Sequence, residues 1–338
     1  MVSSYGVKPG FKLAAFATLF AISVVVLGSF TRLVDAGLGC PDWPTCYGHI
    51  WAPQTDEQIN RANEAFPEIP VDLEKTWPEM VHRYLASLLG LLILILAAVS
   101  FRYRHRPEQP FKLPLLLLFM VILQGAFGAW TVTLKLWPQV VTAHLLGGFA
   151  TFTLLWLLTL RLRGAPTGLR FSSAPRQLPR VLAALTLAVV IGQVFLGGWT
   201  TSNYAALACP DLFTCQTQWW PEADYLAGFD LAHPIGPNYL GGHLDVPART
   251  AIHMAHRIGA IITTVMCLWL IWRLVAIRFT GLASALLLIL VAQVTLGLSN
   301  IYFGLPLTVA VLHNLGGALL LATVATVNFT LYREAKHV

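Results

Sequence analysis

The chain alternates long apolar runs with polar segments, and the length of the apolar runs decides its fold class. A helix needs about 20 apolar residues to cross a bilayer, and runs of this length recur along the whole sequence. They predict eight membrane-spanning helices, over 11–31, 79–101, 113–133, 139–161, 180–200, 249–273, 280–299 and 305–331. The first run is too long for a signal peptide and has no small-residue cleavage site, so we expect it to remain as a helix.

The two halves of the chain repeat one another at a spacing of 169 residues, half of the total of 338. The pattern C-P-D-x-x-T-C occurs at 40–46 and again at 209–215, and the apolar stretch before each copy matches as well. A repeat of this kind decides the architecture before any single element does. We therefore predict an all-α integral membrane protein of two tandem, parallel four-helix bundles, residues 1–169 and 170–338. An even number of helices per bundle relates the two by a pseudo-twofold axis along the membrane normal.

Composition and charge agree with a membrane protein. Hydrophobic residues make up 56% of the chain and charged residues 11%, against about 25% charged residues in soluble domains. The net charge of +6 is compatible with a polyanion-binding protein, but acidic residues concentrate in 33–81 and 202–248 and basic ones in 102–112, 162–179 and 274–279. This alternation follows the positive-inside rule. It predicts external acidic loops and two cytoplasmic termini, and it excludes nucleic acid as a partner.

Two cysteine pairs, Cys40 with Cys46 and Cys209 with Cys215, fall in the predicted external loops, where thiols oxidise. The short spacing, with a proline inside each loop, suits a tight disulfide. A structural staple and a redox function are both open. A zinc site is less favoured, because there is no C-x-x-C and no nearby histidine pattern common to both halves.

Four histidines form two pairs related by the repeat: His82 with His144, and His256 with His313. At 1.5 Å per residue, all four lie in the outer layer of the membrane. An ionisable side chain at this depth is functional by default, and an ordinary interhelical hydrogen bond does not explain two matching pairs. Two imidazoles on facing helices of a bundle can ligate one haem iron axially. We therefore predict that each pair holds a haem iron.

The neighbours of the histidines allow two interpretations each. Arg83 and Arg257 follow the first histidine of each pair and either bind haem propionates or anchor the helix at the interface. The glycine pairs at 147–148 and 316–317 either leave room for a flat macrocycle or allow close helix packing.

Taken together, these motifs are similar to those of the haem A synthase family over nearly the whole chain. The residues that carry the resemblance are G-S-F-T-R-L at 28–33, C-P-D-W-P-T-C at 40–46, E-M-V-H-R at 79–83, H-L-L-G-G at 144–148, H-R at 256–257 and H-N-L-G-G at 313–317. The resemblance implies that the protein oxidises the C8 methyl of haem O to a formyl group, which yields haem A for terminal oxidases. It also implies a bacterial inner membrane, a haem b in one half and the substrate haem in the other. Haem O synthase and an electron donor are its implied partners.

One difference between the repeats suggests which half does the chemistry. Glu79 lies one turn before His82, whereas the aligned position of the second half is His253. A carboxylate beside a haem can move protons or stabilise positive charge on the substrate. We therefore assign Glu79, His82 and His144 to catalysis, and His256 and His313 to the resident haem b. The plainer alternative for Glu79 is a helix N-terminal acid that complements the macrodipole.

Two rival functions use the same pattern. A di-haem b electron-transfer protein has the same four histidines and makes no product. A transporter of four plus four helices requires broken helices at mid-membrane, whereas these histidines lie in the outer layer, and it leaves the cysteine loops unexplained.

Overall fold

The computed structural model describes residues 6–164 and 177–335. Eight long helices carry the fold: α1 (Phe11–Leu33), α3 (Leu73–Arg102), α4 (Lys112–Thr133), α5 (Pro138–Arg163), α6 (Gln177–Ser202), α8 (Val246–Ala276), α9 (Thr280–Tyr302) and α10 (Leu307–Ala335). All eight are long and apolar enough to cross a membrane. The predicted all-α, multi-pass architecture is confirmed. The predicted boundary between residues 169 and 170 lies outside the described residues.

The predicted starts of two helices are wrong, because polar first turns extend them beyond their apolar runs. The Asp72 carboxylate accepts the amide of Glu74 at 3.0 Å, so α3 begins at Leu73 rather than at 79. The Asp245 carboxylate likewise accepts the amide of Ala248 at 3.2 Å and caps α8. Such caps satisfy helix N–H groups that have no partner within the helix. As a result, His82 lies well inside α3 rather than in its first turn.

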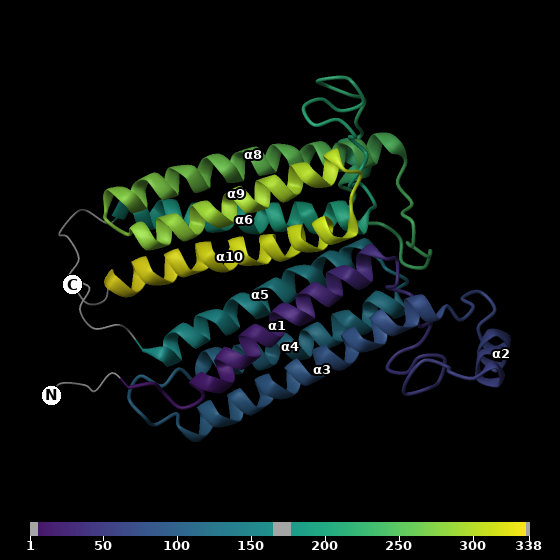
Figure 1. Ribbon diagram of the computed structural model, residues 1–338, viewed down its shortest axis with the longest axis horizontal. Coiled ribbons are helices and arrows are strands. Elements are labelled where there is room, and N and C mark those ends of the chain that lie inside the picture. Colours follow the sequence, from purple (N-terminus) through teal and green to yellow (C-terminus); the bar gives the residue numbers. More distant parts are fainter. Residues whose placement is uncertain (1–5, 165–176, 336–338) are drawn as a thin grey trace.

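The helices form two bundles that pack side by side (Figure 1). In the first, α1 packs on α3 and α5, and α4 joins α3 to α5. In the second, α6 packs on α8 and α10, and α9 joins α8 to α10. The bundles contact each other through α1 with α10 and through α5 with α6. Since the repeat relates α1 to α6 and α5 to α10, each of these contacts is the repeat equivalent of the other. This pattern is consistent with the predicted pseudo-twofold relation.

The two bundles share one core. A continuous cluster of buried apolar side chains runs from Ala14 in α1 to Leu331 in α10. Polar contacts cross the interface inside it: the indole N–H of Trp156 donates to the Thr326 hydroxyl at 2.8 Å, and the hydroxyls of Thr142 and Ser202 are 3.0 Å apart. Since these polar groups find their partners across the interface, they help to hold the two bundles in one register.

The two long loops lie at one end of the molecule, opposite the start of α1 and the end of α10 (Figure 1). The first contains α2 (Asp56–Ala65), and the second contains α7 (Tyr225–Gly228); neither short helix was predicted. The second loop also crosses to the first bundle, where the indole N–H of Trp137 donates to the carbonyl of His233 at 3.1 Å. The second loop therefore links the two halves at this end of the molecule.

Candidate functional site

Each cysteine pair closes a compact loop at the loop end of its bundle. Cys40 bonds to Cys46, and Cys209 bonds to Cys215, which confirms the predicted pairing. The two residues that follow the second cysteine of each loop have positive φ angles. In the first loop these angles are 54° at Tyr47 and 76° at the following glycine. Both central residues of a type I′ turn require such angles, so each disulfide is followed by a tight hairpin turn.

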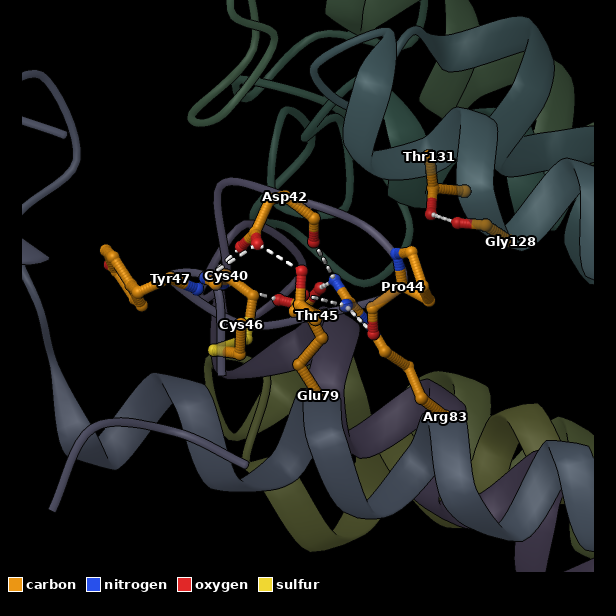
Figure 2. A network of polar contacts seen from close by, with 11 residues as sticks. Cys40, Asp42, Pro44, Thr45, Cys46, Tyr47, Glu79, Arg83, Gly128 and Thr131 are labelled. Atoms are coloured by element: carbon orange, nitrogen blue, oxygen red, sulfur yellow. Dashed lines mark hydrogen bonds and ion pairs between the residues drawn. A yellow bond between two sulfur atoms is a disulfide. The ribbon is translucent and has the colours of Figure 1, made fainter. Parts of the chain in front are cut away.

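The aspartate of C-P-D-x-x-T-C holds the first loop together from inside (Figure 2). Its Oδ2 accepts the Thr45 hydroxyl at 2.5 Å and the amide of Gly48 at 2.9 Å, while Oδ1 accepts the amide of Tyr47 at 2.6 Å. In the second loop, Asp211 accepts the Thr214 hydroxyl at 3.0 Å. The spacing is the same in both copies because the aspartate of each loop accepts hydrogen bonds from its own loop and so stabilises the turn.

Tyr47 ties the first loop to the segment that leads into α3. Its hydroxyl donates to the carbonyl of Ile69 at 3.1 Å. Burial, with the carboxylates of Glu79 and Asp42 nearby, raises the pKa of Tyr47 to about 12. The phenol is therefore neutral at physiological pH and remains a donor.

An arginine from the bundle fixes each loop by its backbone. Arg83 of α3 donates to the carbonyl of Thr45 at 2.7 Å and to that of Asp42 at 3.0 Å (Figure 2). Arg257 of α8 donates to the carbonyls of Thr214 and Cys209, at 2.8 and 2.7 Å. The guanidinium donors are thus directed largely at the loops, a use that the sequence analysis missed.

The residue four positions before each arginine contacts the same loop. Glu79 is 5% exposed; one carboxylate oxygen accepts the amide of Cys40 at 3.0 Å, and the other forms an ion pair with Arg83. At the aligned position, Nδ1 of His253 accepts the amide of Cys209 at 3.1 Å. The two halves therefore share this contact but make it with different side chains, a carboxylate in the first half and an imidazole in the second.

The predicted histidine pairs lie on facing helices. His82 on α3 and His144 on α5 have ring centroids 6.5 Å apart and planes at 88°. His256 on α8 and His313 on α10 both line one cavity. Nδ1 of His82, His144 and His313 is buried without a hydrogen-bond partner. No group of three or more His, Cys, Asp or Glu side chains is placed to hold a metal ion within 6–164 and 177–335. Two histidines per half suit a haem iron, because the macrocycle supplies its other ligands.

Glycines face all four imidazoles, and they too follow the repeat. A Cβ at Gly28 of α1 would lie 2.7 Å from Cε1 of His82, and one at Gly128 of α4 would lie 3.5 Å from Cε1 of His144. The repeat-related glycines of α6 and α9, at 197 and 297, face His256 and His313 in the same way. The sequence analysis placed Gly28 in a repeated motif without giving it a role, and it missed the glycine pair at 128 and 297, although their spacing of 169 was visible. They leave room for the imidazole rings between the helices.

The glycines after His144 and His313 serve a different purpose. A Cβ at Gly147 would overlap the side chain of Gln124, and one at Gly316 would overlap that of Gln293. The first glycine of each pair therefore permits close packing of a glutamine from the neighbouring helix. Gly317, the second glycine, lines the second-half cavity. Of the two open interpretations, helix packing fits the first glycine and space for a ligand fits the second.

The second-half cavity has a volume of about 1180 Å³. Small-molecule pockets span roughly 300–1,000 Å³, so this one has room for a large, flat molecule. Three histidines line it, His253, His256 and His313, and the rest of its wall is mostly apolar. Leu145 and Phe149 of α5 contribute to this wall from the first half. The size, the apolar lining and the imidazoles of His256 and His313 fit a haem.

The fold and the paired histidines define a class of protein: a multi-pass helical membrane protein whose two repeated bundles each present two facing histidines and a disulfide loop. Residues 12–325 match the family described as cytochrome oxidase assembly protein. The chain is 46% identical to "Heme A synthase" of Shewanella oneidensis, over 96% of this chain and 97% of the relative. It is 29% identical to the "Heme A synthase" of Nitrosospira multiformis, over 94% and 91% of the two chains. The chain therefore belongs to the cytochrome oxidase assembly protein family.

Proposed function

We propose that this protein is a haem A synthase, which oxidises the C8 methyl of haem O to a formyl group. The observation that carries the proposal is the repetition of one histidine-pair site in both halves, with Glu79 in one and His253 in the other. Two related sites with different chemistry suit one resident cofactor and one substrate. The name "Heme A synthase" of the relatives supports the same activity.

The second half holds the resident haem b. His256 and His313 would hold its iron, and the bound haem would supply a redox centre there. The side-chain amide of Gln193 lies 3.1 Å from Nδ1 of His256 and 3.0 Å from its carbonyl, so it fixes the orientation of this ring. The first half has Val24 at the corresponding position. At this repeat position, therefore, the second half has a hydrogen-bonding side chain beside its first histidine and the first half has an apolar one.

The first half takes haem O as substrate. The 6.5 Å between the rings of His82 and His144 suits one metal ion between them, because bonds from imidazole nitrogen to metal are about 2 Å long. The two histidines orient the macrocycle, and Glu79 provides the only carboxylate one turn from either first histidine. Oxidation withdraws electrons and protons from a methyl carbon, and a fixed negative charge stabilises the positive character that develops.

The charge pattern sets the cellular context of the proposal. The acidic loops face outward, both termini are cytoplasmic, and the bacterial relatives favour the bacterial inner membrane. Haem O synthase supplies the substrate, and a separate donor or acceptor exchanges electrons with the resident haem. Arg83 and Arg257 remain candidates for propionate contacts as well as loop anchors.

A haem extraction experiment tests the function. Membranes that contain haem O synthase are prepared with and without this protein, and their haems are extracted and identified by mass. Haem A should appear only when the protein is present, with haem b retained on the purified protein. Haem b alone, with haem O unconverted, would instead establish a di-haem b electron-transfer protein.

A further inference from the structure

The wall of the second-half cavity includes residues of the first half. Arg32, at the end of α1, lines this cavity together with Leu33 and Asp35. One terminal nitrogen of Arg32 donates to the carbonyl of Thr201 at 2.7 Å, and its guanidinium lies 4.2 Å from the ring centroid of Tyr204. A cation of one repeat is thus anchored on the other repeat.

These partners are repeat equivalents of one another. Thr201 occupies the position of Arg32 in the second half, and Tyr204 occupies that of Asp35. The four residues meet where the two halves touch, and Arg32 is the one cation among these four. The charge at this junction is therefore asymmetric, and Arg32 lines the cavity that contains His256 and His313.

Arg32 also has hydrogen-bonding capacity to spare. Its Nε is buried and has no partner. Its ion pair with Asp35 is a single 3.3 Å contact to a carboxylate side chain that is 49% exposed, and exposed ion pairs of this kind contribute little. Arg257, the other arginine of the cavity wall, has both terminal nitrogens bonded to loop carbonyls. A partly buried cation in a cavity wall, with its Nε free to donate, matches a carboxylate ligand.

We propose that Arg32 binds a carboxylate of the tetrapyrrole held in the second-half cavity, and so anchors the resident haem from the opposite repeat. This inference rests on the proposed haem b site. It deepens that proposal by distinguishing the two halves. Thr201, which stands at the repeat position of Arg32, is uncharged, so a ligand of the first half has no matching anchor. The resident haem is thereby retained, whereas the substrate of the first half is free to leave as product.

The test compares two ligands in one protein. In a His82→Ala background, which confines ligand binding to the second half, the affinity for haem b and for its dimethyl ester is measured from the low-spin absorption spectrum. The ester lacks carboxylates. We expect it to bind on the order of 10-fold more weakly, the effect of one lost charge-assisted hydrogen bond. Arg32→Gln should weaken haem b binding by the same factor and leave ester binding unchanged.

Three further variants make the test specific. Arg32→Lys keeps the charge and should restore part of the preference for haem b over the ester. Asp35→Asn removes the competing carboxylate and should increase the preference. Arg61→Gln, on the exposed face of α2, should change nothing. The inference is overturned if Arg32→Gln leaves the preference for haem b over the ester unchanged. It is also overturned if the variant weakens the binding of both ligands equally and this loss depends on anionic lipid. If His256→Ala also binds haem b normally, the haem b assignment itself is wrong.

Discussion

The carboxylate of Glu79 accepts the backbone amide of Cys40 at 3.0 Å, which links the proposed catalytic acid directly to the first disulfide loop. Its other oxygen is paired with Arg83, whose guanidinium holds the same loop by the carbonyls of Asp42 and Thr45. Acid, arginine and loop therefore form one connected network of polar contacts (Figure 2). A change in any member is felt by the others, because buried polar groups depend on their partners.

Replacement of Glu79 by glutamine separates charge from shape. The amide keeps an acceptor for the Cys40 N–H but loses the negative charge opposite Arg83. We expect the fold and the second-half haem b to persist, and haem A formation to fall by about 10²–10³, the usual effect of losing one such contact in the transition state. The measurement is the haem profile of membranes that express the variant.

The matched control is Glu74→Gln, an exposed acid in the first turn of the same helix, which should leave the haem profile unchanged. Normal haem A yield from Glu79→Gln would reduce Glu79 to a loop anchor. It would also remove the basis for assigning catalysis to the first half.

The four histidines should divide into two classes. His256→Ala or His313→Ala is expected to remove the low-spin haem b spectrum of the purified protein, because each deletes a proposed ligand of the haem iron. His82→Ala should keep that spectrum and lose haem A formation. His243→Ala, an exposed position in the second loop, is the control. Retention of haem b by both second-half variants would exclude this assignment of the resident site.

The sequence predicted the features that depend on local composition and on the repeat. Apolar runs gave the eight long helices, and the duplicated spacing gave both disulfides. Helix starts were missed where a polar cap such as Asp72 precedes the apolar run. Hydrophobicity alone does not show where the first turn begins.

Side-chain direction could not be predicted, because it depends on tertiary contacts. Arg83 reaches loop carbonyls only because the loop folds back over α3. His233 lies in the second long polar loop, yet its side chain is 10% exposed, and its ring packs 6.3 Å from that of Trp199. The loop that crosses between the bundles buries it. Arg32 was noted as part of a motif, but its place in the cavity of the other half required the structure.

The two disulfides should differ in their effect on activity. Each closes a loop with a sequence separation of 6, so its removal should cost about 2 kcal/mol by the loop-entropy estimate. The double variant Cys40→Ser/Cys46→Ser should also lower haem A formation per folded molecule, because the amide of Cys40 positions Glu79. The matched variant Cys209→Ser/Cys215→Ser should lose stability with less effect on turnover.

Thermal unfolding and haem A yield, normalised to folded protein, measure the two effects. Equal turnover in both double variants would make the first disulfide a structural staple only. Peptide mass spectrometry without reduction provides an independent check, since free thiols at all four positions would contradict the pairing.

The glycine opposite each imidazole offers a test that changes no ligand. A Cβ at Gly297 would lie 3.1 Å from Cε1 of His313, closer than ordinary packing allows, so the ring must move. We expect Gly297→Ala to lower haem b occupancy and shift the low-spin spectrum while α9 remains folded, because alanine favours a helix. Gly281→Ala is the control on the same helix, since a Cβ there meets nothing within 4 Å. If the two variants bind haem b alike, His313 is not held at the position that ligation requires, and the second-half site must be assigned to other residues.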